Sequence, residues 1–187
     1  MAYQDDIKKA AALLLPWNKL SGCNILVTGA TGLIGGCLVD VLMAHKGRNY
    51  NVYASGRNEE RAGRRFLKYA DDNAFHFVKY DVAQPLEYDV NFQYIIHAAS
   101  GAYPEEFIKH PVEVIKGNIN GLDNLMGYGI QHGIKRLLYI SSGEVYGEGD
   151  GRVFTENYSG YVDCTSLRSC YPSSKRAAET LLSLIHI

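Results

Sequence analysis

The chain has 187 residues, of which 47% are apolar and 21% charged, and its formal net charge at pH 7 is -1. This composition fits a globular protein of about one domain with its own hydrophobic core, and it excludes a disordered chain. The balanced charge gives no reason to expect nucleic acid or an anionic membrane as a partner, and no segment reaches the length of a membrane span.

Predicted helices and strands alternate along the chain. A first helix from Asp5 to Leu15 is expected to pack an apolar face on the domain and to end at Pro16, with Trp17 anchoring the approach to the first strand. Short apolar runs predict strands at residues 25–27, 51–55, 75–80, 94–98 and 137–141. Further helices are predicted up to about residue 45, over 59–69, through 112–126 with a cap at Gly133, and from about Pro172 onward. This alternation favours the α/β class, with a doubly wound parallel sheet.

The segment from Asn24 to Gly36 joins the first strand to the next helix through closely spaced glycines. Gly29 lets the chain turn sharply, Gly32 lets the backbone approach a pyrophosphate, and Gly35 lets the helix pack closely on the strand. A diphosphate would bind the free N–H groups at the helix N-terminus, where the helix dipole favours negative charge. The spacing is one residue longer in its first gap than the common Gly-x-Gly-x-x-Gly fingerprint. Alone, it is also compatible with a tight turn that binds nothing.

Candidate site residues follow the end of every predicted strand. They are Gly29, Arg57, Asp81, Ala99 and Ser142. In a doubly wound sheet, ligands gather at the carboxyl ends of the strands, near the switch in strand order. The long segment from Ser142 to Ser169 is rich in Gly, Ser and Tyr, and such a loop inside a compact domain is usually functional. Together these positions predict a binding site at one edge of the sheet.

Tyr171 and Lys175 stand four residues apart, so a helix places both side chains on one face. A free phenol, with a pKa of about 10, is a weak base at neutral pH, but a neighbouring ammonium and a positively charged nicotinamide both favour phenolate. Lys175 can also hydrogen-bond ribose hydroxyls, and Ser142 can hold a sugar hydroxyl that is being oxidised. The alternative is an exposed Tyr and Lys on a surface helix.

Four motifs occur in a characteristic order: Thr28-Gly-Ala-Thr-Gly-Leu-Ile-Gly35, His97-Ala-Ala99, Ser141-Ser-Gly-Glu-Val-Tyr-Gly147 and Tyr171-x-x-x-Lys175. In this order they resemble the extended short-chain dehydrogenases that act on nucleotide sugars, the NAD-dependent epimerase/dehydratase family. The resemblance runs from about residue 20 to residue 181. It implies a Rossmann-like fold, a tightly held NAD(P) cofactor, a nucleotide-sugar substrate and transient oxidation of a sugar C4 hydroxyl.

The resemblance also assigns roles by position. Tyr171 matches the family's base, Lys175 its modifier and ribose ligand, and Ser142 the donor that positions the hydroxyl. The pair Asp81-Val82 matches the adenine contacts, and Asn118 matches a helix Asn near the cofactor, although a helix Asn is by default a polar surface residue. The full set expected to contact the cofactor is Gly29, Thr31, Gly32, Leu33, Ile34, Gly35, Arg57, Asn58, Asp81, Val82, Ala98, Ala99, Ser100, Asn118, Tyr171 and Lys175.

One departure from the family pattern concerns the reaction. Dehydratases place Asp-Glu before Val-Tyr-Gly, the Asp being the acid for the leaving hydroxyl, whereas this chain has Gly143 and Glu144. A Glu without the Asp, followed by Arg168-Ser-Cys-Tyr-x-x-x-Lys-Arg-Ala-Ala-Glu-Thr180, is most similar to UDP-glucuronate decarboxylases, and Glu144 would then act on the oxidised sugar. Glu144 as a solvated loop carboxylate is the alternative. The other functions considered are a nucleotide-sugar 4-epimerase or 4,6-dehydratase and, in another class, a non-catalytic NAD(P)-sensing module.

A second departure concerns the cofactor. Family members that use NAD carry an acidic residue at the end of the second strand, where it binds the ribose 2′-OH. Gly56 stands at that position and Arg57 follows it. An arginine there can pair with a 2′-phosphate, which favours NADP, whereas stacking of Arg57 on adenine would suit an NAD enzyme.

We expect residues 1–20 to form a helical lead-in, residues 21–181 an incomplete NAD(P)-binding domain, and residues 182–187 a non-native tail. Family members continue well beyond the Tyr-Lys helix, so the last strands and the substrate domain are expected to be missing and this chain to be inactive by itself. The full-length protein is expected to be a homodimer. The cysteines, Cys23, Cys37, Cys164 and Cys170, show neither Cys-x-x-Cys nor metal-ligand spacing, so we expect buried free thiols, no metal and a cytoplasmic location.

Overall fold

The structure, a computed structural model, describes residues 2–185. Its centre is a parallel sheet of five strands in the order β3-β2-β1-β4-β5. The strands are β1 (Asn24–Thr28), β2 (Asn51–Gly56), β3 (Phe75–Lys79), β4 (Tyr94–His97) and β5 (Arg136–Tyr139). Every predicted strand is confirmed, with ends shifted by one or two residues at most. The strand order reverses between β1 and β4, which is the switch point of a doubly wound sheet.

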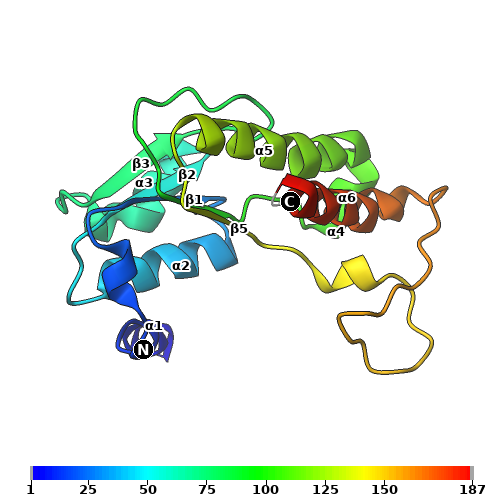
Figure 1. The fold of residues 1–187 in the computed structure, drawn as a ribbon, viewed down its shortest axis with the longest axis horizontal. Coiled ribbons are helices and arrows are strands. Elements are labelled where there is room, and N and C mark those ends of the chain that lie inside the picture. The colour runs from blue at the N-terminus through cyan, green and yellow to red at the C-terminus, as the bar shows by residue number, and fades with distance from the viewer. Residues whose placement is uncertain (1, 186–187) are drawn as a thin grey trace.

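Helices cover both faces of the sheet (Figure 1). α2 (Leu33–Ala44) and α3 (Glu59–Phe66) lie on one face, and α5 (Pro111–Gln131) lies on the other with α6 (Cys170–Ile185) beside it. Side chains of β1 alternate between the layers, because Ile25 and Val27 pack with α2 and α3 whereas Leu26 packs with α5. A strand covered on both faces must be apolar at successive positions, which is why β1 reads as a continuous apolar run.

The helix ends follow local sequence signals. Gly133 has φ +70°, and the N–H of Ile134 bonds back to the carbonyl of Gly129 at 2.8 Å, so α5 ends at the predicted cap. α6 begins at Cys170, two residues before Pro172. A short helix directly before α5, α4 (Pro104–Lys109), was not predicted. The 3₁₀ turns η3 (Gly143–Tyr146) and η4 (Leu167–Ser169) lie near the two ends of the long segment after β5.

The first helix corrects the prediction at its C-terminal end. α1 (Ala2–Ala11) buries Ile7 and Ala11 against the domain, but it ends well before Pro16. Leu13, Leu14 and Leu15 are exposed in the connection that follows, with Leu14 fully exposed. Three consecutive apolar residues cannot share one helix face, and the residue before a proline disfavours helical backbone. The predicted anchoring by Trp17 is confirmed, since its ring stacks on His45 with centroids 4.2 Å apart.

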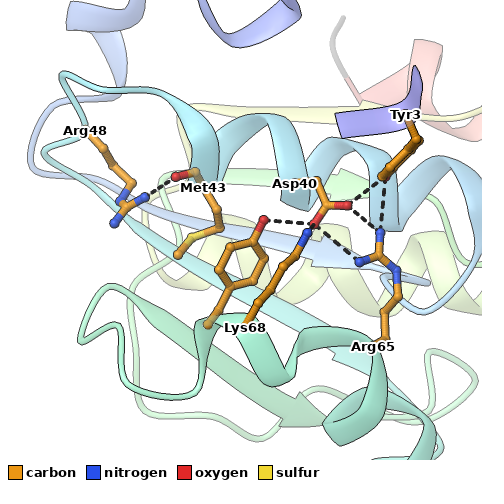
Figure 2. Close-up of polar contacts among 7 residues, drawn as sticks. Tyr3, Asp40, Met43, Arg48, Arg65 and Lys68 are labelled. Carbon is orange, nitrogen blue, oxygen red and sulfur yellow. Dashed lines mark hydrogen bonds and ion pairs between the residues drawn. The ribbon is translucent and has the colours of Figure 1, made fainter. Parts of the chain in front are cut away.

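A buried carboxylate ties α1, α2 and α3 together (Figure 2). Asp40 of α2 has no exposed surface and accepts hydrogen bonds from Tyr3 of α1 at 2.7 Å and from Arg65 of α3 at 2.6 Å. Tyr69 donates a further bond at 2.9 Å, and Lys68 forms an ion pair at 2.9 Å. Burial raises the pKa of Asp40, but the bonds from Arg65, Tyr3, Lys68 and Tyr69 overcome it and lower the pKa to about 2. The cluster therefore fastens the lead-in helix to the layer that follows the glycine turn.

Several smaller expectations have mixed outcomes. Cys23 and Cys170 are buried and Cys37 is partly buried, but Cys164 is exposed, so the prediction of buried thiols is wrong there. α6 continues into the predicted tail, where Leu182 packs partly buried beside Leu122, while residues 186 and 187 lie outside the described part.

Within residues 2–185, no helix is long and apolar enough to cross a membrane, and no three His, Cys, Asp or Glu side chains gather as metal ligands.

Candidate active site

The glycine turn after β1 leaves no room for a side chain at Gly29 or at Gly35. Gly29 has φ +64°, and a Cβ at this position would lie 2.7 Å from the carbonyl carbon of Ala98 at the end of β4. A Cβ on Gly35 would overlap the carbonyl oxygen of Gly29. The backbone at the ends of β1 and β4 and in the first turn of α2 is therefore in direct contact, without side chains between. The glycine motif predicted this close packing.

The N-terminus of α2 offers free backbone donors at this turn. Gly32 is the N-cap residue and has no side chain to cap the helix, and the N–H of Gly36 is bonded back to the Gly32 carbonyl at 3.0 Å. The first-turn N–H groups of residues 33–35 have no partner within the helix, by helix geometry. Leu33 and Ile34 are exposed beside them. A cradle with glycines at its closest contacts and free N–H groups at the start of the helix fits the diphosphate of a dinucleotide cofactor.

The end of β2 lies next to this cradle. A Cβ on Gly56 would lie 3.6 Å from the hydroxyl oxygen of Thr31, so the glycine of β2 faces the threonine of the turn. Arg57 is exposed at the end of the strand. Asn58 caps α3, because its side-chain oxygen accepts the N–H of Arg61 at 2.8 Å. The structure thus places Thr31, Gly56 and Arg57 on the side of the turn where the adenine ribose was expected.

The segment after β3, beyond β2, and the end of β4, on the other side of β1, also lie at this edge of the sheet. The carboxylate of Asp81 accepts the N–H of Ala83 at 3.1 Å, and the carbonyl of Val82 accepts Asn124 Nδ2 of α5 at 2.9 Å. Thr28 hydrogen-bonds the N–H of Ala99 at 3.3 Å and the Nδ1 atom of His97 at 2.8 Å. Burial and the nearby Lys175 lower the pKa of His97 to about 3. A neutral imidazole therefore joins β1 to β4 beneath Ala98 and Ala99.

Asn118 is a buried linker, so its default reading as a surface residue is wrong. It is 1% exposed, its Oδ1 accepts the Ser100 hydroxyl at 2.8 Å, and its Nδ2 donates to Ser174 Oγ at 2.9 Å. Ser174 precedes Lys175 on α6. Asn118 thus connects the segment after β4 to the helix that carries Tyr171 and Lys175.

Tyr171 and Lys175 are both buried, so they are not an exposed pair on a surface helix. Tyr171 is 7% exposed and its ring stacks on Phe107 of α4, with centroids 4.8 Å apart. Lys175 is 2% exposed, and its Nζ lies 5.7 Å from the Tyr171 ring centre and donates to the carbonyl of Ile140 at 2.8 Å. Burial lowers the pKa of Lys175 to about 8. A cation of reduced basicity therefore sits beside the phenol, at the carboxyl end of β5.

Ser142 and Glu144 begin the segment after β5. The Ser142 hydroxyl accepts the N–H of Glu144 at 3.2 Å and so caps η3. Glu144 is not simply solvated, because its Oε1 lies 2.5 Å from Arg168 Nη2. Arg168 in turn lies over the ring of Phe107, 5.2 Å from its centre. Phe107 thus contacts both Tyr171 and the guanidinium of Arg168, which in turn pairs with Glu144.

A pocket of about 400 Å³ opens beside this ion pair. Glu144, Arg168, Asp163 and Tyr161 are among its lining residues. Its wall combines carboxylates, a guanidinium that is already paired with Glu144, and hydroxyl groups, which suits a ligand rich in hydroxyl groups better than an apolar one. The pocket lies next to the Tyr171 helix, since Pro172 also lines it.

The fold and the turn together define a Rossmann-like dinucleotide-binding protein. The chain belongs to the NAD dependent epimerase/dehydratase family, which matches residues 25–186. The family and fold predictions are confirmed.

Individual relatives agree with this assignment. The chain is 36% identical over 169 residues to UDP-glucuronic acid decarboxylase 6 of Arabidopsis thaliana, covering 89% of this chain and 47% of that protein. It resembles the structure of UDP-glucose 4-epimerase from Thermotoga maritima with UDP-glucose, at 25% identity and a TM-score of 0.66, covering 86% of this chain and 50% of that one. A UDP-glucose-4-epimerase from Stenotrophomonas maltophila with bound NAD shares the fold at 23% identity and a TM-score of 0.69, covering 87% and 48%. The chain thus spans about half the length of these proteins.

Sequence reasoning missed several contributors to this site. Phe107, Asn124 and Ser174 are an aromatic and two small polar residues on helices, and no motif marks them. Arg168 was part of a recognised string, but its pairing with Glu144 bridges 24 residues of irregular chain. Such contacts depend on how the long segment folds back, which periodicity cannot predict.

Proposed function

We propose that the complete protein is a nucleotide-sugar enzyme that uses a nicotinamide cofactor and decarboxylates UDP-glucuronate. The observation that carries this proposal is the burial of Tyr171 and Lys175 together at the carboxyl end of β5, beside the Glu144–Arg168 pair. The relatives named as UDP-glucuronic acid decarboxylases support the substrate. The intact set of Ser, Tyr and Lys side chains speaks against a sensing module, which has no use for a buried phenol beside an ammonium.

The chain's own residues divide the work between binding and proton transfer. The glycine turn and the N-terminus of α2 would hold the cofactor diphosphate, and Lys175 would bind its ribose. A bound nicotinamide would supply the acceptor for the hydride that leaves C4 of the sugar. Tyr171 takes the proton of the C4 hydroxyl, Lys175 favours the phenolate, and Ser142 orients the hydroxyl.

A ketone at C4 makes the C5 carboxylate of a glucuronate labile. The bond between C5 and the carboxyl carbon breaks, CO2 leaves, and the electron pair moves into the C4 carbonyl to form an enolate. The carbon at C5 then takes up a proton, which gives the 4-keto pentose. Return of the hydride to C4 and of the proton from Tyr171 to the C4 oxygen would give the UDP-pentose. This step needs no acid aimed at a leaving hydroxyl, and Gly143 has no side chain to supply one. Glu144, held in direction by Arg168, faces the pocket where the oxidised sugar would lie.

The cofactor preference is part of the proposal. Gly56 supplies no carboxylate for a ribose 2′-OH, and Arg57 stands exposed beside it, so we expect NADPH to bind at least as well as NADH. Fluorescence titration of both cofactors against the wild type and Arg57→Ala decides the point. Tighter NADH binding that is unchanged by the substitution would contradict a role for Arg57 in reading a phosphate.

The reaction is tested by mass spectrometry of sugar nucleotides after incubation of the complete gene product with UDP-glucuronate, UDP-glucose or a dTDP-hexose. We expect CO2 and a UDP-pentose or its 4-keto form from UDP-glucuronate alone. Tyr171→Phe should abolish the reaction, Glu144→Gln should slow it with cofactor binding intact, and Tyr103→Phe, at an exposed tyrosine, should leave it unchanged. A C4 epimer without CO2 would move the assignment to the 4-epimerases. A 4-keto-6-deoxy product would assign a 4,6-dehydratase.

A further inference from the structure

Arg176 of α6 reaches two carbonyl groups in the long segment after β5. Its Nε atom donates to the carbonyl of Val145 at 2.6 Å, and its Nη2 atom donates to the carbonyl of Gly160 at 2.9 Å. Val145 belongs to η3, the turn that also contains Glu144 and is capped by Ser142. Gly160 lies where the chain returns past that turn. One side chain therefore joins the outgoing and the returning parts of the segment to the helix of Tyr171 and Lys175.

The backbone around this guanidinium is closed tightly. The N–H of Glu148 bonds the carbonyl of Tyr161 at 2.9 Å, and the N–H of Gly160 bonds the carbonyl of Tyr146 at 2.7 Å. Gly147 has φ +71°, and a Cβ there would lie 2.6 Å from the Tyr161 carbonyl oxygen and 2.8 Å from Arg176 Nη2. A Cβ on Gly160 would overlap the carbonyl of Glu148. The two passes of the chain are thus packed backbone to backbone against Arg176.

This arrangement matters because the expected reacting groups come from separate segments. Ser142 and Glu144 are carried by the turn after β5, whereas Tyr171 and Lys175 are carried by α6. Without a contact that ties η3 to α6, the turn could shift relative to the helix. A displacement of about 1 Å at a reacting group can lower the rate about 100-fold. A planar guanidinium with donors at fixed angles restricts such a shift, whereas the ammonium of a lysine has freely rotating donors on a flexible stem and fixes the two carbonyls less firmly.

We propose that Arg176 is a positioning residue that sets Ser142 and Glu144 against Tyr171 and Lys175 without touching substrate or cofactor. Its effect on turnover rests on the proposed function, but its hold on the segment does not. Loss of the guanidinium should release residues 147–160 and lower kcat, while the glycine turn and the strand ends that would bind the cofactor stay intact.

The test compares Arg176→Ala and Arg176→Lys with Arg152→Ala in the complete gene product. Arg152 is a matched control because it is an exposed arginine whose contacts stay within the same segment: its Nε and Nη2 donate to Asp150, two residues away, at 2.8 and 2.5 Å, and its guanidinium lies 5.9 Å from the Tyr158 ring centre. We expect Arg176→Ala to lower kcat by about 100-fold with the dissociation constant for NAD(P)H within about twofold of wild type. Arg176→Lys should retain part of the rate, and added ethylguanidinium should restore part of it to Arg176→Ala. Arg152→Ala should match the wild type.

Chymotrypsin supplies a readout without turnover. Cleavage after Phe154 should be faster in Arg176→Ala than in both the wild type and Arg152→Ala. Unchanged cleavage, a kcat equal to that of Arg152→Ala, or a loss of rate accompanied by a loss of cofactor binding that neither the lysine variant nor ethylguanidinium restores would overturn the proposal. A wild-type protein that converts none of the nucleotide sugars would refute the proposed function instead, and the protease comparison would still decide whether Arg176 holds the segment.

Discussion

Asp40 is a fully buried carboxylate whose removal should destabilise the domain by a measurable amount. Asp40→Asn keeps the shape of the side chain but removes its charge and turns one acceptor into a donor that faces other donors. The lowering of its pKa from 3.8 to about 2 is equivalent to about 2.4 kcal/mol of folding free energy at pH 7. The side chains of Arg65 and Lys68 are 29% and 38% exposed, so water can solvate them once the carboxylate is gone. We therefore expect Asp40→Asn to lower the free energy of unfolding by about 3 kcal/mol, the lower end of the range for breaking a buried ion pair.

The assay is thermal and urea unfolding of the wild type and Asp40→Asn across acidic pH. A loss of about 3 kcal/mol lowers the Tm of a domain of this size by about 6–12 °C. Because the folded pKa of Asp40 is depressed, its contribution is complete above about pH 4 and is lost as the pH falls towards 2. The wild type should therefore converge on the variant in that window. Glu60→Gln, which breaks an exposed pair with Arg64, is the control and should cost less than about 0.5 kcal/mol.

Two outcomes would refute this reasoning. An Asp40→Asn variant within about 1 kcal/mol of the wild type at pH 7 would mean that the cluster gains little over hydrated side chains. An acid dependence that is the same for both proteins would mean that Asp40 does not titrate as its surroundings require. Either result would also remove the argument that this cluster fastens α1 to α2.

Three further predictions concern the site. Gly29→Ala should abolish cofactor binding and destabilise the fold, because the φ of this residue is +64° and the added Cβ would lie 2.7 Å from the Ala98 backbone. The control is Gly63→Ala, in open space on α3, which should stabilise the fold by up to about 1 kcal/mol. Thermal melting and cofactor titration measure both variants. Lys175→Met should raise the stability by up to about 3 kcal/mol below pH 8, since the buried ammonium is disfavoured there. The gain should vanish near pH 10.5, as urea unfolding against pH will show. Asn118→Ala should cost about 2 kcal/mol by leaving Ser100 and Ser174 without their shared partner, and an unchanged urea midpoint would contradict the link between β4 and α6.

Local chemistry explains why the strands and the glycine turn could be predicted. An apolar run such as Ile25 to Val27 has few alternatives to a doubly covered strand, and Gly29 is a residue type that accepts φ +64° without strain. The end of α5 at Gly133 follows from the same kind of local rule. The prediction failed at Leu13 to Leu15, because hydrophobicity alone did not reveal that α1 has no further surface to pack against.

The sequence by itself determined the order of elements and the family, because these depend on spacing along the chain, such as glycines at a turn. The same spacing marked Tyr and Lys four residues apart as candidates for the reaction. Only the tertiary structure decided what those residues contact. The burial of Lys175, the pairing of Glu144 with Arg168 and the double contact of Arg176 with Val145 and Gly160 all join segments that are distant in sequence. Such contacts arise from how an irregular loop of nearly thirty residues folds back on a helix, and no local periodicity encodes that path.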